Sequence, residues 1–114
     1  MQLKILKIID ETPKGLTTGF QLKVVCQVET GPEFTIGVPV LITKAVIEQK
    51  IALSNLLILH LEKYGLDACP DMFIDTRKLE LDKARPTEVP VPCTVDLGGM
   101  EMMNKRVVEK LSKR

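Results

Sequence analysis

Hydrophobic and polar residues alternate along several segments of the chain with a period of two, which is typical of a β-strand that buries one face. The clearest alternation runs through residues 19–29, and a second one follows over residues 33–41. Between them, Thr30-Gly31-Pro32 supplies residue types that favour a turn. We therefore predict two strands joined as a β-hairpin.

Two further segments predict strands on a less regular pattern. Residues 2–10 are mainly apolar, but Lys7 interrupts the alternation that Leu3 and Ile5 begin, which indicates a β-bulge. Residues 77–82 place two leucines between charged neighbours and predict a short, partly exposed strand.

Residues 88–97 predict a fifth strand that lies at an edge of the sheet. Pro90 and Pro92 are two residues apart, so both lack an N–H group on the same side of the strand. We expect the first half of this strand to bond through residues 89, 91 and 93 to a neighbour on its other side.

A long helix is predicted over residues 44–64, with Thr43 as its N-cap and Gly65 as its C-terminal stop. Its main apolar stripe has Leu56 beside it and Leu59 almost opposite. A helix that is apolar nearly all round is buried on more than one side. We therefore expect Leu56 and Leu59 to need cover that one sheet face cannot give.

A second, amphipathic helix is predicted over residues 100–112. Apolar residues recur there at helical spacing, and basic residues surround them. The apolar positions are Met100, Met103, Val107 and Leu111.

These elements predict one α+β domain over residues 1–114, in the order β-β-β-α-β-β-α. In it, a mainly antiparallel sheet packs against one long central helix, and an amphipathic helix follows at the C-terminal end. A mixed sheet is the weaker alternative, because the strands alternate strongly and the first connections are short.

Composition and charge exclude several classes of protein. With 45 % apolar and 27 % charged residues the chain is far from the disordered range. A net charge of +1 gives no overall field that would attract nucleic acid or an anionic membrane, although residues 100–114 alone carry +3. The uncharged run of residues 51–61 is too short to span a bilayer, so no membrane association is predicted.

The three cysteines favour a reducing, cytoplasmic location. Cys26, Cys69 and Cys93 cannot all pair within one chain, and their spacing matches no zinc motif. The N-terminal residues carry lysines within their apolar stretch and do not resemble a signal peptide. Cys26 and Cys93 occupy apolar strand positions, where cysteine acts as a small hydrophobic residue.

The sequence indicates no enzyme, no cofactor and no metal site. His60, the single histidine, has no neighbour at the spacing of a metal-binding or catalytic pair, and Cys69 lies between two acidic residues that disfavour a thiolate. Asp71 with the segment 80–83 partly matches a metal-dependent nuclease pattern, but Leu81 stands where the second carboxylate is needed.

We therefore predict a small non-catalytic protein-interaction module: a subunit of an assembly, an adaptor or an inhibitor, binding another protein or itself as a homo-oligomer. Methionine adapts to irregular partner surfaces, and two adjacent methionines cannot both face one groove. The predicted contact residues are Leu56, Leu59, Met102, Met103 and Val107.

Nucleic-acid binding through the basic C-terminal helix is the alternative. It has few aromatic residues available for base stacking, since the chain contains three Phe, one Tyr and no Trp. The residues predicted to make such contacts are Lys105, Arg106, Lys110 and Lys113.

Overall fold

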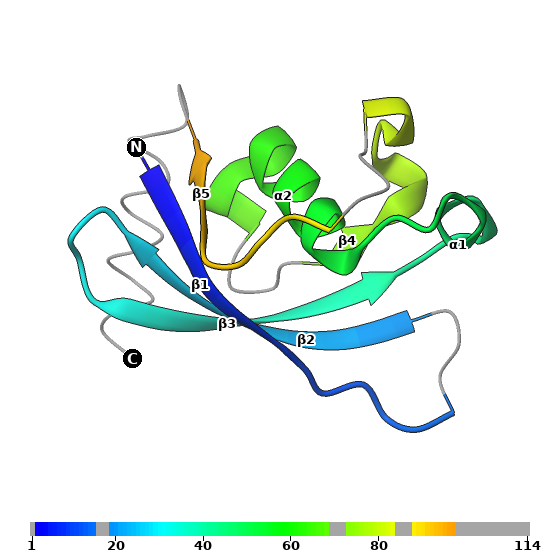
Figure 1. The fold of residues 1–114 in the computed structure, drawn as a ribbon, viewed down its shortest axis with the longest axis horizontal. Coiled ribbons are helices and arrows are strands. Elements are labelled where there is room, and N and C mark those ends of the chain that lie inside the picture. Colours follow the sequence, from blue (N-terminus) through cyan, green and yellow to red (C-terminus); the bar gives the residue numbers. More distant parts are fainter. Residues whose placement is uncertain (1, 16–18, 69–72, 84–87, 98–114) are drawn as a thin grey trace.

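A computed structural model of the chain describes residues 2–15, 19–68, 73–83 and 88–97. Its described strands form one curled sheet in the order β4-β3-β2-β1-β5 (Figure 1). The strands are β1 (Gln2–Asp10), β2 (Gly19–Val28), β3 (Glu33–Leu41), β4 (Ile74–Asp75) and β5 (Cys93–Asp96).

The predicted hairpin is confirmed. β2 and β3 pair antiparallel in an unbroken register from Gly19↔Leu41 to Gln27↔Glu33. The N–H of Gly31 donates to the Val28 carbonyl at 2.9 Å and closes the turn. Every second residue along each strand faces the core, because side chains alternate between the two faces of a strand.

The bulge predicted near Lys7 is also confirmed. In the antiparallel ladder between β1 and β2, Ile5 faces Cys26 whereas Lys7 faces Val25, so Leu6 is the extra residue. The extra residue lets the apolar side chains on both sides of Lys7 reach the core.

The fifth strand lies at the edge of the sheet, as predicted, but it is shorter than residues 88–97. β5 pairs antiparallel with β1 from Gln2↔Asp96 to Ile5↔Cys93, where the bulge of β1 begins. The prediction was wrong for residues 88–92, because the chain bends at Val91 and Pro92 and pairs with no strand there.

No strand forms over residues 77–82, so that prediction was wrong. The chain instead pairs briefly as β4, parallel to β3, and then forms two short 3₁₀ helices, η2 (Thr76–Lys78) and η3 (Leu81–Lys83). The Asp75 carboxylate accepts the backbone N–H of Arg77 at 3.0 Å, which turns the chain away from the sheet. The parallel pairing makes the sheet mixed.

The single long helix predicted over residues 44–64 is two helices, α1 (Lys44–Gln49) and α2 (Leu53–Tyr64). Thr43 is the N-cap residue of α1, as predicted, although its side chain caps no N–H group. Lys50 adopts the left-handed conformation (φ 55°, ψ 40°) and ends α1. The spacing of apolar residues does not reveal this break, because Val46 before it and Ile51 after it both face the core and so continue the apolar pattern.

The expected antiparallel sheet against one long central helix is therefore wrong. The described fold is a mixed, curled five-stranded sheet with two helices, and only α2 is long. α2 lies inside the curl and contacts both edge strands, β4 and β5 (Figure 1). One buried apolar cluster joins the strands, α1 and α2. The predicted helix over residues 100–112 lies outside the described residues.

Candidate interaction surface

The predicted contact residues that the structure describes differ in burial. Leu56 is 0 % exposed and is part of the core, so its side chain offers no surface to a partner. Leu59 is half-buried and packs against the margin of that core. The other predicted contacts, Met102, Met103 and Val107, lie outside the described residues.

Two adjoining hollows meet at Leu59, and together we call them the Leu59 groove. One, of about 290 Å³, lies between α2 and the segment that contains η2 and η3, with Leu79 on its far side. The other, of about 310 Å³, lies between α2 and β5 and is lined by Ile58, Val89 and Cys93 among others. Leu59, Glu62 and Lys83 line both hollows.

The sequence analysis missed these neighbours of Leu59 for one reason. Leu79 was assigned to a strand that does not form, and Val89 to a part of the fifth strand that does not pair, so their spatial relation to α2 could not be deduced. The groove exists because the chain leaves the sheet after β4 and returns to it at β5, passing α2 on both occasions.

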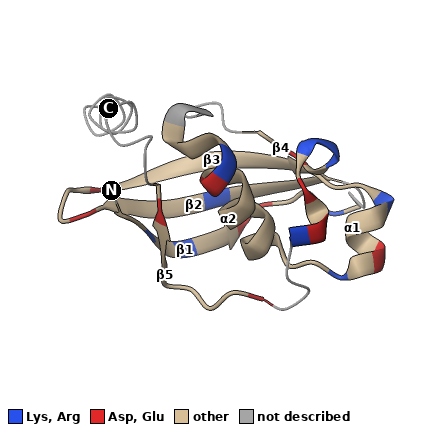
Figure 2. Cartoon of the chain, turned by 90° about the horizontal axis from the view of Figure 1, so that it is seen from above, with Lys and Arg blue, Asp and Glu red and all other residues tan. Residues whose placement is uncertain are grey.

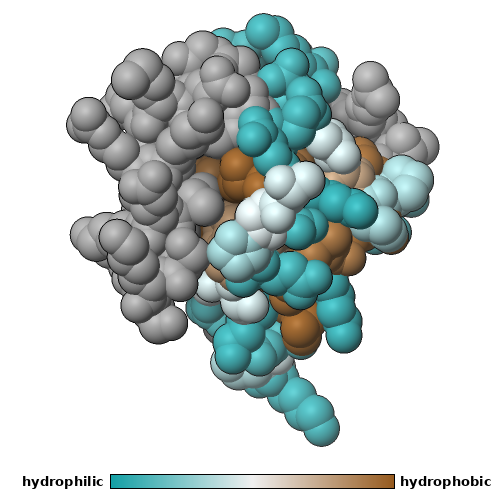
Figure 3. Space-filling view, turned by 90° about the vertical axis from the view of Figure 1, so that its left-hand side faces the viewer, coloured by the Kyte–Doolittle hydropathy of each residue, from teal (hydrophilic) through white to brown (hydrophobic). Residues whose placement is uncertain are grey.

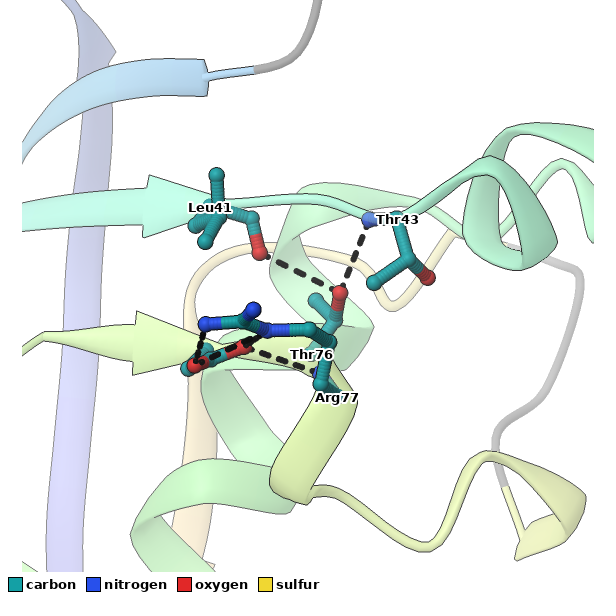
Figure 4. A network of polar contacts seen from close by, with 5 residues as sticks. Leu41, Thr43, Thr76 and Arg77 are labelled. Carbon is teal, nitrogen blue, oxygen red and sulfur yellow. Dashed lines mark hydrogen bonds and ion pairs between the residues drawn. The ribbon is translucent and has the colours of Figure 1, made fainter.

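A polar network fixes the wall of the groove that follows β4 (Figure 4). The N–H of Thr43 donates to the hydroxyl of Thr76 at 2.9 Å, and that hydroxyl donates to the Leu41 carbonyl at 3.1 Å. Thr76 is 0 % exposed, and both bonds are part-buried. They attach η2 to the end of β3 and so position Leu79 opposite α2.

An ion pair next to Thr76 holds the same turn. The Arg77 guanidinium donates to both oxygens of the Asp75 carboxylate, with its terminal nitrogen 2.8 Å from Oδ2 and its Nε 3.0 Å from Oδ1. These hydrogen bonds lower the pKa of Asp75 from 3.8 to about 2, against the opposing effect of burial. A bidentate pair of this kind fixes both side chains in orientation.

The rim of the Leu59 groove carries charges of both signs. Lys83 Nζ lies 2.9 Å from a Glu80 carboxylate oxygen, which lowers the pKa of Glu80 and raises that of Lys83. Lys63 Nζ donates to the Lys78 carbonyl at 2.8 Å. On the face of the molecule that lies at the left in Figure 1, apolar patches lie between polar side chains (Figure 3).

The groove shows little nucleophilic chemistry. Burial raises the pKa of the Cys93 thiol, so the thiol form is favoured over the reactive thiolate. Within the described ranges, no group of three or more His, Cys, Asp and Glu residues could hold a metal ion. Cys69 and Asp71 lie outside those ranges.

The basic residues predicted for nucleic acid, Lys105, Arg106, Lys110 and Lys113, lie outside the described residues, and the described surface adds little to that hypothesis. Acidic and basic residues are interspersed over the elements (Figure 2). Lys23, for example, lies 3.2 Å from a Glu11 carboxylate oxygen.

Among the described helices, none is both long and apolar enough to cross a membrane. No protein-family model, curated protein or solved structure matches the chain.

Proposed function

We propose that this protein is a small non-catalytic interaction module, and that its Leu59 groove receives apolar side chains of a partner protein. The observation that supports the proposal is the half-buried Leu59 where two hollows meet. An apolar floor inside a polar, solvated rim is the usual anatomy of a protein–protein interface. The module would serve as a subunit of an assembly, an adaptor or an inhibitor.

The mixed charges of the rim favour a protein as the occupant. Glu62, Glu80, Lys63 and Lys83 bring both signs to the groove, which suits a protein surface with complementary charges better than a polyanion. The partner is another protein or a second copy of this chain, and molar mass in solution distinguishes the two.

The experiment compares two variants in which a large apolar side chain is replaced by serine, one inside the groove and one outside it. Leu59→Ser removes the floor of the groove, whereas Ile47→Ser is a matched control, because Ile47 is 50 % exposed on α1 and lines neither hollow. Thermal unfolding first establishes that both variants fold.

If a second copy is the partner, light scattering shows an oligomer at micromolar concentration that Leu59→Ser dissociates and Ile47→Ser does not. If another protein is the partner, one protein is captured by the wild type and by Ile47→Ser but not by Leu59→Ser. A monomer with no capture that depends on Leu59 would overturn the proposal.

We further propose that the protein works in a reducing, cytoplasmic environment. Cys26 and Cys93, the cysteines of the described ranges, carry thiols rather than forming a disulfide. Thiols that persist in this form are usual where thioredoxin and glutathione maintain them.

A further inference from the structure

A smaller hollow of about 200 Å³ is lined by His60, Tyr64, Phe73, Asp75 and Lys78, and we call it the His60 hollow. It lies between α2 and β4, and it shares no residue with the Leu59 groove as defined above. The whole chain has only five residues with aromatic rings, three Phe, one Tyr and one His. Three of these five converge on this hollow.

The imidazole of His60 is the unusual member of this lining. Its exposed fraction is 5 %, yet neither ring nitrogen has a hydrogen-bond partner among the described residues. Burial lowers its pKa, so at neutral pH the ring is uncharged and has one donor and one acceptor. Buried polar groups are rarely left unpaired in native proteins, because each one forfeits its hydrogen bonds to water.

Two aromatic rings form apolar walls next to the imidazole. The Tyr64 ring lies against it, with ring centroids 4.8 Å apart and planes inclined by 46°. Phe73, which directly precedes β4, also lines the hollow and is 47 % exposed, which is unusual for a large apolar ring in a chain with so few of them. A flat molecule entering the hollow would contact both rings.

The charges around the hollow favour an anion. Lys78 lines it, and Lys63 lies with its Nζ 5.3 Å from the centroid of the Tyr64 ring. Asp75 is the one carboxylate in the lining, and its charge is already balanced by the bidentate contact with Arg77. Lys78 is also close enough to Asp75 to lower the pKa of that carboxyl, so two cations, Arg77 and Lys78, act on the single carboxylate of the lining.

We propose that the His60 hollow binds a small planar carboxylate, with one aromatic ring against Tyr64 and Phe73 and its carboxylate near Lys78. The volume lies below the roughly 300–1,000 Å³ that is usual for sites of drug-sized ligands, so one ring is the largest group that fits. Both ring nitrogens of His60 are shielded, so a hydrogen bond to the ligand requires the imidazole to turn about its χ2 angle.

The test uses sodium benzoate as the probe and two spectroscopic signals that belong to single residues. Tyr64 is the one fluorophore of its kind in a chain without tryptophan, and His60 gives the one set of imidazole resonances in a ¹H–¹³C spectrum. Benzoate in the millimolar range is expected to change both signals saturably. Benzamide, which lacks the charge, and acetate, which lacks the ring, are expected to bind about tenfold more weakly or not at all.

Variants assign the response to this hollow. Phe73→Ala and Lys78→Gln change exposed side chains and are each expected to weaken benzoate binding by about fivefold or more. Ile47→Ala is the matched control, because Ile47 is similarly exposed and lies outside the hollow; it should bind benzoate like the wild type.

Benzoate that leaves both signals unchanged, or that binds Phe73→Ala as tightly as the wild type, would overturn the proposal. Because Leu59 lies outside the His60 hollow, Leu59→Ser is expected to retain benzoate binding, so the two proposals fail independently of each other.

Discussion

The hydroxyl of Thr76 joins two segments that are more than thirty residues apart in the sequence. It accepts from the backbone after β3 and donates to the last residue of that strand, and Thr76 itself is fully buried. One side chain thus satisfies two part-buried backbone groups and holds the start of η2 in place.

Replacing Thr76 with valine keeps the shape of the side chain and removes both hydrogen bonds. Because the Thr43 N–H and the Leu41 carbonyl then lose this partner in a part-buried site, we expect the free energy of unfolding to fall by about 1–3 kcal/mol. Urea unfolding measures the change. Thr35→Val is the control, since Thr35 is exposed on the outer face of β3, and a similar loss there would contradict the explanation.

The burial of His60 predicts that the stability of the protein depends on pH. Its pKa is lowered from 6.5 by burial, so below about pH 6.5 the unfolded chain binds a proton that the folded chain resists. The contribution to stability is complete above that pH and is lost as the pH falls toward the lower folded pKa. One such group changes the free energy of unfolding by at most about 1.4 kcal/mol per pH unit.

Urea unfolding at pH 7.5 and at pH 5.5 tests this prediction, with the lower free energy of unfolding expected at pH 5.5. The carboxylates with lowered pKa values, such as Asp75 and Glu80, titrate at lower pH and contribute little in this window. His60→Leu should remove most of the difference. Equal stability at both pH values in the wild type would contradict the argument.

At the scale of elements, the end of α1 shows how the chain breaks a helix without glycine. The N–H of Lys50 bonds to the Ile47 carbonyl and that of Ile51 to the Val46 carbonyl, and Val46 and Ile51 are both buried. This is the hydrogen-bond pattern of a Schellman motif, in which glycine usually takes the left-handed position that Lys50 occupies here.

Lys50→Gly is therefore expected to stabilise the protein, by about 0.5–1 kcal/mol, because glycine adopts the left-handed conformation without the steric cost of a side chain. The control is Glu48→Gly, which places glycine inside α1 and should destabilise by a similar amount. Chemical unfolding gives both values. If Lys50→Gly also destabilises, the conformation of Lys50 is not a source of strain.

Elements whose pattern is local could be predicted from the sequence, and those that depend on distant contacts could not. The β2–β3 hairpin and the bulge of β1 follow from alternation within each strand. Residues 77–82 alternate as well, but the Asp75 carboxylate turns the chain there and 3₁₀ helices form instead. The break at Lys50 has no local signal, since apolar residues on both sides still face the core.

The candidate site was predicted only in part for the same reason. Leu56 and Leu59 were both chosen from their angles around a helix, on the assumption that one flat sheet covers it. The curled sheet instead encloses α2 between its two edges, so Leu56 is buried and Leu59 remains at the margin. Leu79, Val89 and Cys93 join Leu59 through folding of segments that are distant in sequence.

At the scale of the whole molecule, the described elements share one core. A single buried cluster includes residues of the sheet and of both helices, and α2 contacts the two strands at opposite edges. Detachment of any one of these elements from the core would therefore expose apolar surface of the others.

This shared core predicts one cooperative unfolding transition. Far-UV circular dichroism reports the helices and strands, whereas the fluorescence of Tyr64 reports the end of α2. We expect both signals to give the same urea midpoint and the same slope, because small domains with one core unfold in an all-or-none manner. An earlier transition in the Tyr64 signal would show that α2 detaches from the sheet first.

The position of β1 between β2 and β5 has a consequence for folding of the chain during its synthesis on the ribosome. β1 is synthesised before β2 and can pair with it once the hairpin has emerged, but the other side of β1 has no partner until Asp96 and the residues before it are made. At the usual rate of translation, about 5–20 residues per second, that side of β1 stays open for several seconds. During this interval β1, an interior strand of the finished sheet, is an exposed edge strand. Two nascent chains would therefore be most prone to pair with each other through β1.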